Sequence, residues 1–232
     1  MEPGTAICRT CAHVIALPAI LAAALFVAAP PAAAAISDPD LAPYRDLARS
    51  PAAARILAFA RAAMESHWIA TPASDDSLPD WPGAPPRELY VSLVGGSATR
   101  ACIGRPPAGP LAACVRALAI QVLSADPRHP PVRRDELDRL RLVIAFAGED
   151  EEVADPLSVD PAREGLRLAA GGRSIAFLPG EARTVAWALR TARRAGVLPA
   201  GAAVTCSHFS VIVISEPLRP RTYEGGPSHA DE

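Results

Sequence analysis

Two glycine pairs, Gly95-Gly96 and Gly171-Gly172, each separate two short segments whose composition is typical of β-strands. These segments are residues 88–94 and 97–103 around the first pair, and residues 165–170 and 173–178 around the second. Two successive glycines tolerate the positive φ angles that a tight two-residue hairpin turn requires. The sequence therefore predicts two β-hairpins, and antiparallel pairing in any sheet that contains them.

Apolar side chains recur at helical spacing before, between and after the two hairpins. We expect helices over residues 50–68, 111–123 and 181–195, strands over residues 141–147 and 204–215, and a loop over the acidic residues 148–160. Residues 141–147 are apolar on both faces, which is typical of a central strand. This order of elements indicates an α+β fold, with a largely antiparallel sheet and flanking helices.

Residues 1–35 have the pattern of a cleaved secretory signal. Arg9 precedes an apolar run from Val14 to Ala29, and two prolines and a series of alanines ending at Ala35 follow. This pattern predicts cleavage near Ala35 and a mature protein that is periplasmic or secreted. The alternative is a membrane anchor, although this run is shorter than the roughly 20 apolar residues that span a bilayer.

After the signal we distinguish an N-terminal segment (36–54), a folded domain (55–216) and a polar tail (217–232) that we expect to be disordered. The net charge of −2 provides no basic footprint for nucleic acid or for an anionic membrane. The chain contains no lysine, which excludes a Schiff base, a pyridoxal linkage and a P-loop. Cys206 and His208 share a strand face, but a zinc site needs three or four protein ligands, so no metal or cofactor is expected.

The cysteines outside the signal are Cys102, Cys114 and Cys206, because Cys8 and Cys11 lie within it. An odd number of cysteines in an exported protein leaves at least one thiol free or paired between chains. Cys114 falls on the apolar stripe of the helix expected over residues 111–123, which favours core packing. A disulfide between two of the three thiols remains an alternative, and it would make the domain a structural or interaction module.

Five short blocks carry a family resemblance. They are Tyr90-Val91-Ser92-Leu93, Thr99-Arg100-Ala101-Cys102-Ile103-Gly104, Asp126-Pro127-Arg128-His129-Pro130-Pro131-Val132, Phe177-Leu178-Pro179 and Arg194-Ala195-Gly196-Val197. In this order they resemble the AMMECR domain, known in prokaryotes as AmmeMemoRadiSam system protein A, and five ordered blocks are more specific than any single motif. Ala101 stands where the family signature has glycine, and His129 stands at an aromatic position.

The resemblance implies a two-lobed α+β sandwich in which the signature lines a cleft between a larger and a smaller lobe. It implies no established activity. Prokaryotic members are associated with a MEMO-like protein and a radical-SAM protein, and export would separate this chain from those partners.

The first functional hypothesis is a domain that binds a small ligand or a partner in the inter-lobe cleft. Arg100, Gly104, Asp126 and Arg128 would be its binding residues, around Cys102. The alternative for Asp126 and Arg128 is a turn that ends the preceding helix and holds a local ion pair.

The second hypothesis is an enzyme with Cys102 as its nucleophile. Arg100 lies two residues away and is expected on the same strand face, where a guanidinium would lower the thiol pKa. His129 or His208 would act as the base. The alternatives are a buried, inert cysteine and a histidine that merely fills an aromatic packing position.

Overall fold

The computed structural model describes residues 38–69 and 78–217. The signal peptide, its membrane-anchor alternative and positions 218–232 of the expected tail lie outside these residues. Within the described ranges, no helix is long and apolar enough to cross a bilayer.

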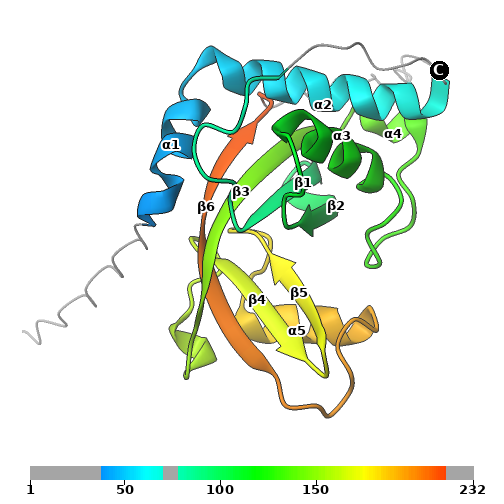
Figure 1. The fold of residues 1–232 in the computed structure, drawn as a ribbon. Coiled ribbons are helices and arrows are strands. Elements are labelled where there is room, and N and C mark those ends of the chain that lie inside the picture. The colour runs from blue at the N-terminus through cyan, green and yellow to red at the C-terminus, as the bar shows by residue number, and fades with distance from the viewer. Residues whose placement is uncertain (1–37, 70–77, 218–232) are drawn as a thin grey trace, which may run out of the picture. The chain divides into compact units, whose positions relative to one another are not determined.

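Six strands form one sheet in which every neighbouring pair is antiparallel. They are β1 (Glu88–Gly95), β2 (Ala98–Arg105), β3 (Arg141–Glu152), β4 (Gly165–Ala170), β5 (Arg173–Phe177) and β6 (Thr205–Ser215), in the order β2-β1-β3-β6-β4-β5. The sheet curls strongly into a half barrel whose two edges are β2 and β5 (Figure 1). The expected α+β class, both hairpins and the interior position of β3 are confirmed.

Helices cover parts of this sheet. They are the 3-10 turns η1 (Pro39–Leu41) and η2 (Pro156–Ser158) and the helices α1 (Ala42–Ala48), α2 (Pro51–Ile69), α3 (Leu111–Gln121), α4 (Arg134–Leu137) and α5 (Val185–Arg194). The three long helices predicted from periodicity correspond to α2, α3 and α5. The last one begins at Val185, four residues later than expected, because the Thr184 hydroxyl accepts the Trp187 N–H and caps the helix there.

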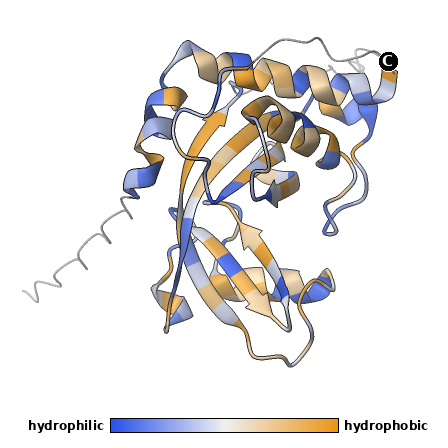
Figure 2. Ribbon diagram, viewed as in Figure 1, coloured by the Kyte–Doolittle hydropathy of each residue, from blue (hydrophilic) through white to orange (hydrophobic). Residues whose placement is uncertain are grey.

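The larger hydrophobic core lies between helices α1 to α4 and one face of β1, β2 and β3 (Figures 1 and 2). Leu41, Tyr44 and Leu47 are buried in it, and the Tyr44 ring packs 4.7 Å from the Phe146 ring. The segment 36–54 therefore contributes part of the core through its first helix. A smaller core lies between α5 and β4, β5 and the start of β6.

The loop expected over residues 148–160 is wrong in its first part, because β3 continues to Glu152. A register shift between Ala147 and Asp150 lets the acidic end of β3 pair with β6. Asp150 accepts a hydrogen bond from Arg167 Nε at 2.8 Å, so its charge is compensated within the sheet. β3 and β6 thereby run through both halves of the molecule's folded part (Figure 1).

Candidate functional site

Cys102 lies in the edge strand β2, opposite Ser92 of β1. Its neighbours Ala101 and Ile103 face the larger core, so the alternation of a strand directs the Cys102 side chain to the opposite face. There it packs in a third, small cluster with Tyr90 and other apolar residues, and it is 8 % exposed.

Asp126 and Arg128 close the edge of β2 at Cys102. The Cys102 N–H points away from β1 and donates to Asp126 Oδ2 at 2.8 Å, while Arg128 Nη2 lies 3.5 Å from the Cys102 carbonyl oxygen. Arg128 donates to both carboxylate oxygens of Asp126, through Nε at 3.0 Å and Nη2 at 2.9 Å. An edge strand exposes unpaired backbone groups, and here two buried side chains satisfy them.

A third residue, Glu181, joins this network from the segment before α5. Its Oε1 accepts from Arg128 Nη1 at 2.6 Å, and its Oε2 accepts from the Leu178 N–H at 3.0 Å. One buried guanidinium therefore contacts two buried carboxylates and connects β2, the 126–131 loop and the segment before α5. Sequence reasoning missed Glu181, whose only signal is its place two residues after the block 177–179.

Burial is the largest single influence on the ionisation of each group in this network. It raises the pKa of the Cys102 thiol to about 12, and the nearby Glu181 carboxylate adds to this while Arg128 opposes it. Burial also raises the pKa of Glu181 against the attraction of Arg128. At Asp126 the same desolvation is outweighed by hydrogen bonds from Arg128 and Cys102, so its pKa is lowered. We attribute the difference to the larger number of donors around Asp126.

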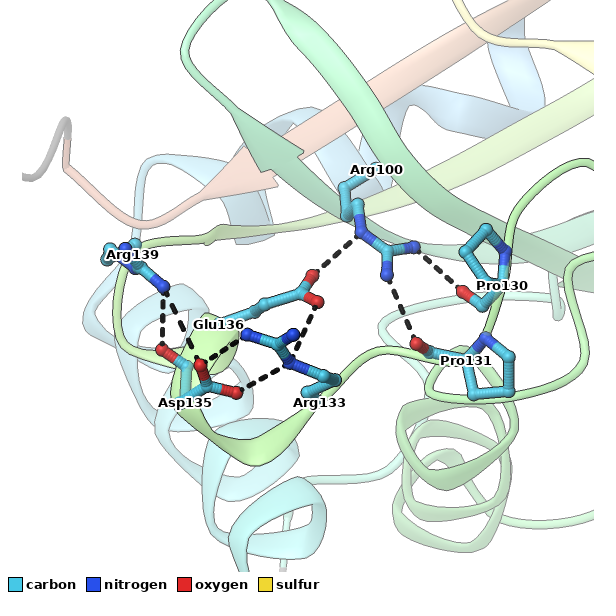
Figure 3. Close-up of polar contacts among 7 residues, drawn as sticks. All are labelled: Arg100, Pro130, Pro131, Arg133, Asp135, Glu136 and Arg139. Carbon is cyan, nitrogen blue, oxygen red and sulfur yellow. Dashed lines mark hydrogen bonds and ion pairs between the residues drawn. The ribbon is translucent and has the colours of Figure 1, made fainter.

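Arg100 does not lie beside Cys102, contrary to the expectation. Its Nε donates to Glu136 Oε2 at 2.8 Å, and its Nη1 and Nη2 donate to the carbonyl oxygens of Pro130 and Pro131 at 2.9 and 3.1 Å (Figure 3). Arg100 thus holds the end of the 126–131 loop against α4. The guanidinium that approaches Cys102 is that of Arg128.

A β-bulge explains why Arg100 departs from the expected face. Leu93 pairs with Ala101 while Val94 pairs with Thr99, so Arg100 is an extra residue and the alternation breaks at it. Ala101 is 2 % exposed and belongs to the larger core, so the alanine at the glycine position of the signature is accommodated as a core residue.

Gly104 lies directly opposite Tyr90, whose ring covers it. A Cβ atom at position 104 would overlap the Tyr90 ring, and a Cβ atom at position 165 would overlap the Phe209 ring in the same way. The two rings are nearly parallel, with centroids 6.2 Å apart. Aromatic rings laid over glycines thus join β1 and β2 to β4 and β6 across the face that carries Cys102.

A second charged network surrounds the Tyr90 hydroxyl, which donates to Glu88. Arg167 Nη2 donates to Glu88 Oε2 at 2.7 Å and to the Tyr90 oxygen at 3.1 Å, and Arg167 Nε binds Asp150. Burial, followed by the Glu88 charge, raises the pKa of Tyr90, so the phenol is neutral at physiological pH. No sequence motif indicated these residues.

Both networks border one hollow of about 420 Å³, which lies between the two edge strands of the sheet. It is lined by Glu88, Tyr90, Cys102, Ile103, Gly104, Arg105, Pro106, Ala125, Asp126, Pro127, Arg128, Arg167, Ser174, Ile175, Ala176 and Val197. The structure therefore brings Cys102, Gly104, Asp126 and Arg128 together here, and it leaves Arg100 outside.

The two candidate bases lie elsewhere. His129 lines a different hollow, together with residues of α5, and no contact within the described part of the chain joins its ring to Cys102. The His208 ring lies 3.3 Å from Glu164 and 3.6 Å from Glu151. Within residues 38–69 and 78–217, no three histidine, cysteine or acidic side chains are grouped as a metal site would require.

The disulfide alternative is contradicted by the packing of the thiols. Cys102, Cys114 and Cys206 are free and buried, and each belongs to a different hydrophobic cluster. Because each thiol packs in a different cluster, pairing any two of them would require those clusters to rearrange.

Comparison with known proteins identifies the family. The AMMECR1 family model matches residues 57–213, which include both networks. The chain belongs to the AMMECR1 family. It is 30 % identical over 146 residues to a protein of Methanosarcina barkeri, a match that covers 56 % of this chain and 72 % of that protein. It is 34 % identical over 104 residues to a protein of Thermotoga maritima, covering 40 % of this chain and 60 % of that protein.

The fold of this AMMECR1-family domain also has a solved counterpart. The crystal structure of an uncharacterized protein from Pyrococcus horikoshii superposes with a TM-score of 0.52 and 23 % identity, covering 71 % of this chain and 91 % of that chain. At that identity the likeness concerns the fold alone.

Proposed function

We propose that this AMMECR1-family domain is a binding domain that takes a short, extended, peptide-like ligand in the hollow between β2 and β5. The observation that carries the proposal is that both edge strands of the curled sheet line one hollow. The backbone amide of Gly104 points the same way as that of Cys102, two residues earlier, which is away from β1. Edge strands with outward backbone groups are the usual acceptors of an added peptide strand.

The charges around the hollow favour a ligand with both donors and acceptors. Glu88 and Arg167 lie on its walls, and the exposed Arg105 lies at the end of β2. Because Glu88, Arg167, Asp126 and Arg128 are held by one another, they form rigid walls. The Asp126–Arg128 pair is buried and the Glu88–Arg167 pair is partly exposed, and we take both to hold the walls of the hollow in place.

The same site disfavours the thiol-nucleophile hypothesis. A thiol with a pKa of about 12 is protonated at neutral pH, and the thiolate is the nucleophile. Asp126 binds the backbone N–H of Cys102, and neither His129 nor His208 has a recorded contact with its sulfur. We therefore propose binding without turnover at Cys102.

Backbone amide NMR with a pool of random-sequence hexapeptides tests the proposal. We expect saturable shifts at the amides of Gly104 and of residues 174–176, and weaker binding when Ser174→Trp fills the hollow. Ser158→Trp places the same ring on an exposed serine of η2 and should leave the shifts unchanged. Shifts that map elsewhere, or that persist unchanged in Ser174→Trp, would contradict the proposal.

We also propose that the chain is exported, on the strength of the apolar run Val14–Ala29 and the small residues up to Ala35. N-terminal sequencing of the protein from a bacterial host tests this, with recovery of a chain starting near position 36 in the periplasm or medium as the expected result. An intact N-terminus in the membrane fraction would support the anchor alternative.

A further inference from the structure

Arg141, at the start of β3, is a half-buried arginine whose side chain is not used by either network. Its Nε is buried and makes no hydrogen bond within the described part of the chain, and no ion pair or ring contact is recorded for its guanidinium. The other described arginines that are not exposed each contact a carboxylate, a carbonyl oxygen or a ring: Arg45, Arg61, Arg100, Arg116, Arg128 and Arg167. Arg141 is therefore the exception, and a buried charged donor without a partner is costly.

A buried hydroxyl lies on the same strand face. Ser92 is 3 % exposed, and its hydroxyl interacts with the Cys102 thiol but makes no hydrogen bond to any other described residue. The β1–β3 register pairs Ser92 with Val143 and Val94 with Arg141, so Ser92 and Arg141 are diagonal neighbours. A buried hydroxyl thus adjoins Arg141, whose Nε has no partner among the described residues.

Both groups line one cavity of about 250 Å³ on the sheet face opposite the helices. Its floor is formed by β1, β3 and β6, where Ser215 pairs with Val143, and its wall is the segment 178–181. It shares no lining residue with the hollow between β2 and β5. The cavity is thus a separate site.

We propose that this cavity binds the carboxylate of a small organic acid, with Arg141 as the ion-pairing residue and Ser92 as a hydrogen-bond donor. A guanidinium presents a planar set of N–H donors that matches a carboxylate. The bound oxygen atoms would accept from Arg141 Nε, which has no partner among the described residues, and from the Ser92 hydroxyl.

The remaining walls define the rest of the ligand. Val94, Val143, Leu178 and Val213 present apolar surface to the cavity. Its volume lies below the roughly 300–1,000 Å³ of sites for drug-sized molecules, so the acid must be small. A carboxylate with a short branched or aromatic body fits this combination of one cation and apolar walls.

The charged residue on the cavity wall opposite Arg141 favours a ligand with one negative charge over a ligand with two. Glu181 is the acidic residue on the cavity wall, and both its oxygens are engaged, one by Arg128 and one by the Leu178 N–H. It is therefore unavailable as a partner for Arg141, but its charge repels a second negative group. A dianion such as phosphate is accordingly disfavoured.

Methyl NMR of the full chain with benzoate as the probe tests the site. We expect saturable shifts at the methyls of Val143 and Val213, and binding of the neutral isostere benzamide at least about tenfold weaker, because the charge-assisted hydrogen bonds are lost. Arg141→Met should weaken benzoate by a similar factor, and Arg141→Lys should weaken it less. Arg134→Met, an exposed arginine of α4 that lines neither this cavity nor the neighbouring hollow, is the matched control and should have no effect.

Equal binding of benzamide, phosphate binding as tight as benzoate, an unchanged affinity in Arg141→Met, or no saturable shift would each overturn the proposal. If Arg141→Met does not fold, two other measurements still test the proposal. One compares the affinities of benzoate and benzamide in the unaltered protein, and the other measures benzoate binding to Ser92→Ala, which should be weaker. Ser174→Trp, which blocks the hollow between β2 and β5, should leave benzoate binding intact, so failure at one site is distinguishable from failure at the other.

Discussion

At the scale of single residues, Gly104 shows how the signature depends on contact with another strand. Its missing side chain is the space that the Tyr90 ring occupies. We expect Gly104→Ala to destabilise the fold by about 1–3 kcal/mol, the usual range for overpacking. In a Tyr90→Ala background the same substitution should be close to neutral, because the overlap is gone. Denaturant unfolding of the four proteins of this double-mutant cycle measures the coupling, and an equal cost in both backgrounds would contradict it.

Cys102 supplies a second prediction at this scale. Because burial raises its pKa to about 12, we expect iodoacetamide to alkylate it far more slowly in the folded protein at pH 7.5 than in urea. Folding keeps this thiol protonated above pH 9.0, the value for a free thiol, so its contribution to stability falls as the pH rises past 9.0. Mass spectrometry of the alkylated peptide checks the rate, and rapid labelling at neutral pH would restore the nucleophile hypothesis.

The residue scale is also where sequence reasoning was least able to reach the site. The blocks around Cys102 and Asp126 could be recognised, and Gly104, Asp126 and Arg128 do lie together around Cys102. The sequence predicted Arg100 beside the thiol, whereas the structure has Arg128 there. The reason is the bulge at Arg100, which interrupts the alternation of side chains between the two strand faces that the sequence leads one to expect. Glu181 comes from a distant segment, and spacing along a chain carries no information about such contacts.

At the scale of secondary-structure elements, the Asp126 carboxylate functions as the cover of an edge strand. Its pKa is lowered, so its stabilising contribution is present above pH 3.8, the ordinary value, and is lost as the pH falls through the lowered pKa. Glu181 has a raised pKa, so its ionisation costs stability above pH 4.5. The two carboxylates of one network therefore oppose each other on acidification.

Carbon-13 NMR titration of the side-chain carboxyls checks this pair. We expect a midpoint below 3.8 for Asp126 and above 4.5 for Glu181. Asp126→Asn should remove part of the loss of stability that occurs as the pH falls below 3.8, by the linkage of proton binding to folding. A reversed order of the two midpoints would show that Arg128 favours Glu181 over Asp126.

Elements were predicted well where their own residues determine them. Glycine turns and apolar periods placed both hairpins and the three long helices, since these signals are local. The end of β3 was missed because its residues Glu149–Glu152 are acidic, and only the partners in β6 and Arg167 make a strand of them. Tertiary pairing overrode local composition there.

At the scale of the whole folded part, two hydrophobic cores share one sheet. Trp68 and Trp81 pack against the larger core, and Trp187 packs against the smaller one. Because β6 contributes to both cores and pairs with β3 on both sides of the register shift, and because the Tyr90 and Phe209 rings stack on each other, loss of one core should remove support from the other. We therefore expect a single cooperative unfolding transition.

The chain has three tryptophans, so tryptophan fluorescence of two variants can follow the unfolding of each core separately. Trp187→Phe leaves the reporters of the larger core, and the double variant Trp68→Phe, Trp81→Phe leaves that of the smaller core. The unfolding curve of each variant is measured by fluorescence and by circular dichroism. In each of the two variants we expect the two curves to have the same midpoint. In the double variant, Trp187 alone reports by fluorescence. If only in this variant the fluorescence transition came before the dichroism transition, α5 and the strands packed against it would unfold separately. The register shift at Ala147–Asp150 would then act as a boundary between two folding units rather than as a continuous connection.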